Sequence, residues 1–168
     1  MYICNVKFVS YQETDRKFEL KTKINMKIAL ISCVKSKRNL EEGQCIAAKD
    51  LYTSALFTKG WAYAQNLKAD KVYIISAKYK LLNPEQPIET YDETLLNKPA
   101  NECKNWASDV LHSLRKKGIN FEKDEFVILA GQKYYKYLIG DNGIKHYTLP
   151  YQGKRFGEIL KFLNSTLK

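Results

Sequence analysis

A thiol and two amines follow directly after a short apolar run near residue 30. The run "KIALIS" covers residues 27–32 and ends in Ser32, and Cys33, Lys35 and Lys37 follow it at alternate positions. A lysine amine can contact a phosphate or act as a nucleophile, although both lysines could equally be ordinary surface charges. Because no histidine lies near Cys33 in the sequence to activate it, we expect a small buried residue rather than a nucleophile.

A second group of polar side chains lies in the segment "SAKYKLLNPEQPIETYDETL", residues 76–95. The segment opens with Ser76 and Lys78, and it ends near Tyr91 and Asp92. A carboxylate among basic residues would repel phosphates, so Asp92 needs another role. It could orient water, stabilise a positively charged transition state, or read an amino group of a base. A helix cap or an ion pair with a neighbouring lysine is the structural alternative.

Strand-like and helix-like patterns alternate along the chain and must position these groups. Apolar runs predict strands, and apolar positions at helical spacing predict helices, the first of them capped by Ser54. Continuous apolar strands that alternate with helices indicate an α/β domain with a parallel sheet covered on both faces. The expected strands are residues 27–32, 71–76, 125–130 and 144–150, and the expected helices are residues 54–67, 101–117, 132–139 and 153–167.

In such sheets, ligands bind outside the carboxyl ends of the strands, so the loops after the four strands should line one crevice. The third strand is followed by Gln132 and Tyr134, and the fourth by Gln152, Lys154 and Arg155. We expect Lys154 and Arg155 in the first turn of the last helix. Two cations there oppose the helix dipole unless an anion binds.

Tyrosines are numerous, with 12 in the chain. A few at the rim of the crevice would offer flat surfaces on which a base could stack, each contributing about 1–3 kcal/mol. The tyrosines of the predicted loops are Tyr52, Tyr79, Tyr91, Tyr134 and Tyr151.

The charge balance favours a polyanionic partner. Lys and Arg number 28 against 18 Asp and Glu, which gives a net charge of +10. DNA is the partner we expect, RNA stays open, and a lysine-rich surface selected for solubility is the alternative. Two histidines, four cysteines without C-x-x-C spacing and the absence of phosphate-loop motifs give no reason to expect a metal ion or a cofactor. The sequence does not indicate an oligomeric state.

No run of about 18 apolar residues is present, so we expect no membrane span and a cytoplasmic protein with reduced thiols. Alternating apolar and polar residues predict a β-hairpin over residues 2–24. We therefore divide the chain into a hairpin extension, residues 1–25, and an α/β domain, residues 26–168.

Three stretches resemble a known group of small bacterial and phage domains. They are "LISCVKSKR", "AKDLYTSALF" and "IISAKYKLLNPEQPIETYDETL". The group carries a C-x-K-x-K motif after its first strand and a later SAK-x-x-LL motif that ends in Tyr-Asp. The pattern is similar, more distantly, to the core domain of archaeosine synthase and to the uracil-DNA-glycosylase type of three-layer α/β fold. Members of that wider grouping include a DNA glycosylase that defends bacteria against phages with modified DNA.

The resemblance covers about residues 26–160 and implies a pocket. It implies that Cys33, Lys35 and Lys37 lie in the pocket, that Tyr52 and Ser54 line it, and that Ser76, Lys78 and Asp92 form its other wall. The chain lacks the G-Q-D-P-Y-H and H-P-S-P loops of uracil glycosylases, so a modified base is expected rather than uracil.

These observations lead to a DNA glycosylase that flips out and excises a modified base. Asp92 and Lys35 are the catalytic candidates. A non-catalytic nucleic-acid-binding module and a lysine-dependent transferase or lyase are the alternatives. The candidate substrate-binding residues are Ser32, Cys33, Lys37, Tyr52, Ser54, Ser76, Lys78, Tyr91, Gln132, Tyr134, Gln152 and Arg155.

Overall fold

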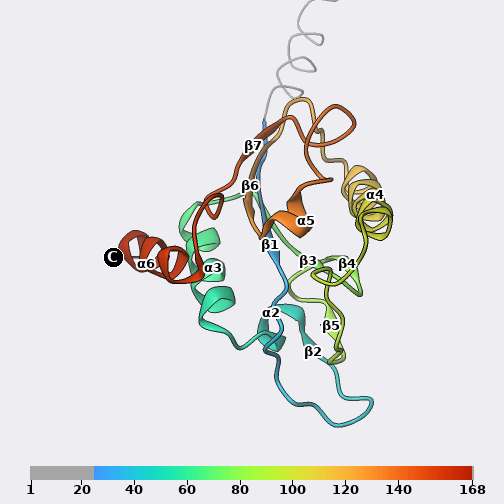
Figure 1. Cartoon of the computed structure of the whole chain (residues 1–168), viewed down its shortest axis with the longest axis vertical. Coiled ribbons are helices and arrows are strands. Elements are labelled where there is room, and N and C mark those ends of the chain that lie inside the picture. Colours follow the sequence, from blue (N-terminus) through green and yellow to red (C-terminus); the bar gives the residue numbers. More distant parts are fainter. Residues whose placement is uncertain (1–24, 168) are drawn as a thin grey trace, which may run out of the picture.

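The computed structural model describes residues 25–167, which form a five-stranded sheet with helices packed against it (Figure 1). Its strands are β1 (Lys27–Ser32), β3 (Lys71–Ser76), β4 (Lys80–Leu82), β6 (Glu125–Leu129) and β7 (His146–Thr148). Their order across the sheet is β4-β3-β1-β6-β7. β1 pairs in parallel with β3 and β6, β7 is parallel to β6, and β4 is antiparallel to β3. The predicted α/β class with a mostly parallel sheet is confirmed.

The middle residues of the central strands are apolar because both faces of the sheet are covered. Ile28, Ala29 and Leu30 of β1 are completely buried, as are Ile74 and Ile75 of β3. Figure 1 shows helices on both sides of the sheet. The helices α3 (Ala55–Asn66) and α6 (Phe156–Thr166) lie on one side, and α4 (Ala100–Lys116) and α5 (Gln132–Tyr135) lie on the other.

The long helices begin close to where the sequence places them. Ser54 is the N-cap of α3, and its Oγ accepts a hydrogen bond from the Phe57 N–H at 3.3 Å, as predicted. The aromatic ring of Tyr63 on α3 meets Phe162 of α6 edge-on, with ring centroids 5.5 Å apart. The last helix is therefore fixed to α3, on the far side of the sheet from α4.

The prediction of a helix over residues 132–139 is wrong beyond Tyr135, because α5 ends at that residue. The chain turns back on itself there, because Ile144 N–H donates to the Leu138 carbonyl at 2.8 Å. A Cβ atom at Gly143 would lie 2.3 Å from that same carbonyl oxygen, so the turn requires glycine at this position. The turn, and not the apolar spacing, decides where the helix stops.

The connections that follow β1 and β3 contain short elements. They are β2 (Ile46–Ala47), α2 (Ala48–Leu51), β4 and β5 (Pro87–Ile88), and β2 pairs with β5 in the antiparallel sense. Elements of two to four residues are too short to have a readable period, and pairing with distant segments holds them. The predicted hairpin over residues 2–24 lies outside the described residues.

Candidate functional site

Loops from three strands meet at the carboxyl edge of the sheet. Cys33 follows β1 and Tyr134 lies in α5 after β6, and the Cys33 Sγ and Tyr134 Oη atoms are 3.3 Å apart. Cys33 is 6% exposed, so the expectation of a small buried residue is confirmed. The thiol therefore belongs to the wall of the site and is not displayed to solvent.

A chain of hydroxyl groups joins three more segments beside this pair. The Tyr91 Oη lies 2.8 Å from the Tyr52 Oη and 2.8 Å from the Ser76 Oγ. The Ser76 Oγ also accepts the Tyr79 N–H at 3.1 Å. Ser76 is completely buried and Tyr52 is 2% exposed, so these hydrogen bonds satisfy polar groups that water cannot reach.

Lys37 extends over this hydroxyl chain. Its Nζ lies 4.3 Å from the centroid of the Tyr91 ring and donates to the Lys35 carbonyl at 3.3 Å. Its backbone forms an isolated antiparallel bridge with Tyr52, which ties the loop after β1 to the hydroxyl chain. Partial burial lowers the pKa of the Lys37 amine, and negative charge on Cys33 and Asp92 partly offsets this effect.

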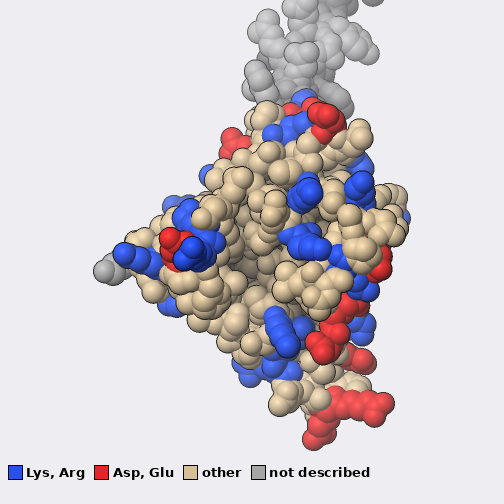
Figure 2. Space-filling model, in the orientation of Figure 1, with Lys and Arg blue, Asp and Glu red and all other residues tan. Residues whose placement is uncertain are grey.

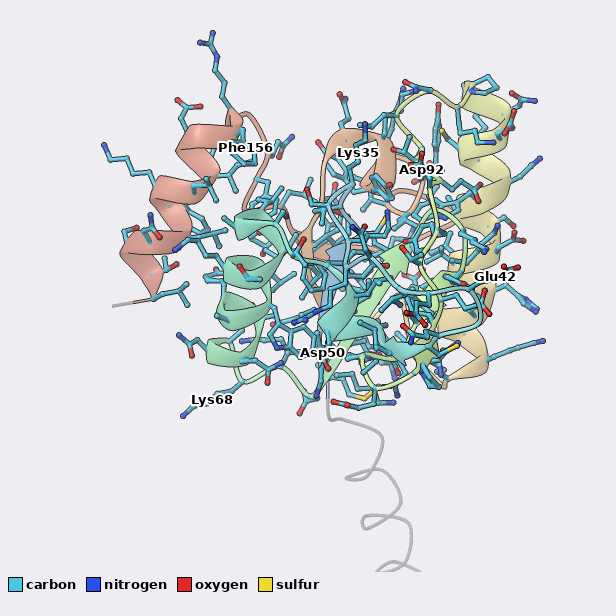
Figure 3. All side chains as sticks on the ribbon, turned by 90° about the horizontal axis from the view of Figure 1, so that it is seen from below. Lys35, Glu42, Asp50, Lys68, Asp92 and Phe156 are labelled. Carbon is cyan, nitrogen blue, oxygen red and sulfur yellow. The ribbon has the colours of Figure 1, made fainter. Side chains whose placement is uncertain are left out.

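Three other charged candidates lie at the surface near the hydroxyl chain. Lys35, Lys78 and Asp92 are exposed, and the Lys78 Nζ lies 5.1 Å from the Tyr79 ring centroid and 6.0 Å from that of Tyr91. Figure 3 places Lys35 and Asp92 on the same side of the molecule. The residues with the strongest sequence signal, from the loops after β1 and β3, are thus brought together.

Three of the five loop tyrosines are buried and cannot serve as stacking surfaces, which corrects the prediction for these three. Tyr52, Tyr134 and Tyr151 are 2%, 7% and 8% exposed, so a base cannot lie flat on their rings. Tyr79 and Tyr91 are half-buried and keep part of their surface accessible. Desolvation raises the pKa of Tyr52, Tyr91 and Tyr134, so these phenols stay neutral and serve as hydrogen-bonding groups.

Trp106 of α4 also contacts the residues of the site, and the sequence did not indicate this role. Its Nε1–H donates to the Ser76 carbonyl at 2.8 Å, and its ring meets the Tyr134 ring edge-on at 5.5 Å. Trp106 lies on the buried face of α4. No local signal in the sequence connects an indole N–H with a carbonyl thirty residues earlier.

Four predicted site residues lie at the margin of this group or outside it. The Ser32 Oγ makes a long 3.5 Å contact with the Leu129 carbonyl, and the Ser54 hydroxyl is used as a helix cap. Gln132 is exposed at the start of α5. Gln152 is exposed in the turn before α6. None of the four has a hydrogen bond to the thiol, hydroxyl and amine groups within the described residues.

The predicted anion site at the last helix is also corrected. α6 begins at Phe156, so Lys154 and Arg155 precede its first turn instead of lying in it. The Glu158 carboxylate accepts the Arg155 N–H at 2.6 Å, so an acidic side chain already occupies the helix N-terminus. In Figure 3, Phe156 lies on the same side as Lys35 and Asp92, to the left of both.

Basic side chains surround a hollow on this face. Figure 2 shows lysines and arginines on several sides of a depression near the centre of the view, over the region where the central strands end. A cavity of about 620 Å³ lies elsewhere, beside the loops that precede β6 and β7. It is lined by Arg115, Gly118, Ile119, Asn120, Phe121, Glu122, Asp141, Asn142 and Gly143, none of which was predicted as a site residue.

The extent of the sequence match decides the family. A family model matches residues 28–165, which include every residue of the site just described. The chain belongs to DUF6884, a family of unknown function. No curated protein and no solved structure matches it.

Two classes of feature are missing from the part of the chain that the structure describes. Within residues 25–167, no group of three or more His, Cys, Asp or Glu side chains is arranged to hold a metal ion. None of the helices described there is both long enough and apolar enough to span a membrane.

Removing the Tyr91 hydroxyl is expected to destabilise the site. Tyr91→Phe leaves the buried Tyr52 hydroxyl without its partner and removes one hydrogen bond from Ser76. We expect a loss of about 1–3 kcal/mol in the free energy of unfolding, measured by urea denaturation. The control Tyr147→Phe alters an exposed tyrosine and should change stability by less than about 0.5 kcal/mol. Equal urea midpoints for Tyr91→Phe and wild type would contradict this role.

Proposed function

We propose that this chain is a DNA glycosylase-like enzyme that turns a modified base out of the helix and cleaves its N-glycosidic bond. The observation that carries the proposal is the convergence at one sheet edge. The loops after β1 and β3 and the helix after β6 bring a thiol, a chain of hydroxyls and a half-buried amine into contact. We further propose that the fold is the three-layer type of the uracil-DNA glycosylases, and that the activity serves defence against phages.

The charges on this face suit a DNA strand. Exposed lysines, among them Lys35 and Lys78, stand beside the site, and the chain carries a net charge of +10. Such groups neutralise backbone phosphates without reading sequence. The strand would follow the basic rim while a single nucleotide enters the hollow, which is the arrangement that base-flipping enzymes use.

The groups inside the site suit a base and its sugar. Tyr79 and Tyr91 are half-buried, so the accessible part of each ring can contact a base, while the buried Tyr52 and Ser76 hydroxyls hold Tyr91 in position. Asp92 lies next in the chain to Tyr91 and is exposed, so water can reach its carboxylate. In this proposal Asp92 orients a water molecule for hydrolysis or stabilises the oxocarbenium-like sugar, as carboxylates do in glycoside hydrolysis.

The test is incubation of the whole protein with phage DNA that carries modified bases, with unmodified DNA of the same length as the control. We expect free modified base, detected by mass spectrometry, and abasic sites that alkali cleaves, with no products from the unmodified DNA. Tight, salt-sensitive binding without any released base would overturn the proposal and leave a nucleic-acid-binding module. The same assay on RNA tells which nucleic acid is the substrate.

A further inference from the structure

We propose that Lys37 is the nucleophile of this site and that its Nζ forms a covalent bond to C1′ of the sugar, which resolves to an imine. The inference rests on the proposed function, because it names the group that attacks the bond to the base. It adds a second activity, since the same amine would condense with the aldehyde of an abasic site that another process has already formed.

The position of Lys37 separates it from the other lysines of the rim. Lys35 and Lys78 are exposed, whereas Lys37 is half-buried, with its Nζ 4.3 Å from the centre of the Tyr91 ring. The backbone bridge to Tyr52 and the hydrogen bond from Nζ to the Lys35 carbonyl limit the positions that the side chain can take. A nucleophilic amine must be held in place and partly desolvated, and Lys37 meets both conditions.

The groups around Lys37 also favour a reactive amine. The Tyr91 ring faces the amine and its phenol stays neutral, Lys78 lies near the same ring, and Cys33 and Asp92 are the nearby acidic groups. Burial lowers the pKa of the Lys37 amine and outweighs the opposing effect of the two acidic groups. The neutral, nucleophilic form is thus more abundant at neutral pH than it is for an exposed lysine.

The proposed step balances without any added oxidant or reductant. The neutral Nζ forms a bond to C1′ while the C1′–N bond breaks, and the base leaves with the electron pair and takes up the proton that Nζ loses. The remaining Nζ–H proton then passes to O4′ as the C1′–O4′ bond opens, which gives the imine. Water hydrolyses the imine, and this releases the Lys37 amine and leaves an abasic sugar.

The test uses an oligonucleotide with one abasic site, incubated with the full chain and sodium cyanoborohydride, which reduces an imine to a stable amine. We expect a covalent protein–DNA product, and peptide mass spectrometry should locate the link at Lys37. Lys37→Arg keeps the charge but cannot form the imine, so the product should be lost. The matched control Lys68→Arg, which alters an exposed lysine distant from Lys35 in Figure 3, should keep it.

Two outcomes would overturn the inference. One is a link that maps to Lys35 or to scattered lysines and survives in Lys37→Arg. The other is release of modified base by Lys37→Arg at the wild-type rate, which would leave the glycosylase proposal intact with water as the nucleophile. Trapping at Lys37 without base release from any modified DNA would support the amine assignment while contradicting the glycosylase proposal, so the two failures are distinguishable.

Discussion

Asp92→Asn is expected to lower the rate of base release from modified DNA by about 10²–10⁴-fold, the range for removal of a general acid or base. The substitution keeps the size of the side chain and removes its charge, so it removes the means of orienting water or stabilising a cationic sugar. Because Asp92 is exposed, the protein should fold as stably as wild type. The measurement is single-turnover release of the base under saturating protein.

The matched control for this variant is Asp50→Asn. Asp50 is exposed in the first turn of α2, and Figure 3 shows it well away from Lys35 and Asp92. Its rate of base release should equal that of wild type. If Asp92→Asn released the base as fast as wild type, the Asp92 carboxylate would have no catalytic role.

The same variant should have the opposite effect on imine trapping at neutral pH. Negative charge on Asp92 raises the pKa of Lys37, so removing that charge lowers this pKa further. The neutral amine then forms at lower pH, and the pH profile of trapping on abasic DNA should shift downward in Asp92→Asn. An unchanged profile would mean that the two groups are not coupled.

Trp106→Ala is expected to cause the largest loss of stability, about 3–5 kcal/mol in the free energy of unfolding. Trp106 is 4% exposed, packs on Tyr134, and donates its Nε1–H to the Ser76 carbonyl. The substitution opens a cavity behind both halves of the site, so the Cys33–Tyr134 pair and the hydroxyl chain lose their common support. Urea denaturation followed by circular dichroism measures the loss.

Two further variants separate the causes of this effect. Trp106→Phe keeps a buried aromatic ring but loses the hydrogen bond and part of the ring volume, so it should cost about 1–3 kcal/mol, less than Trp106→Ala. Trp61→Ala removes a half-buried tryptophan from α3, on the other side of the sheet, and should cost less than Trp106→Ala. A smaller loss for Trp106→Ala than for Trp61→Ala would contradict the role of Trp106 as the main support of the site.

The sequence alone determined the central strands and the general place of the site. The runs that became β1, β3 and β6 are apolar because both of their faces are buried, and this signal is local. Ser54 likewise predicted the start of α3, because its hydroxyl caps a helix N–H group only three residues away in the sequence. Once the strands are parallel, their carboxyl ends share an edge, so the loops with Cys33 and Tyr91 had to meet.

Only the tertiary structure decided which residues of those loops touch. Lys35 and Lys37 look alike in the sequence, yet the bridge to Tyr52 leaves one exposed and makes the other half-buried. The position of Arg155, at the start of α6, depends on the packing of α6 on α3, a contact between elements ninety residues apart. The Trp106 hydrogen bond to Ser76 likewise depends on where α4 lies. The burial of these side chains and the identity of their hydrogen-bonding partners depend on segments distant in the sequence, so no local pattern predicts them.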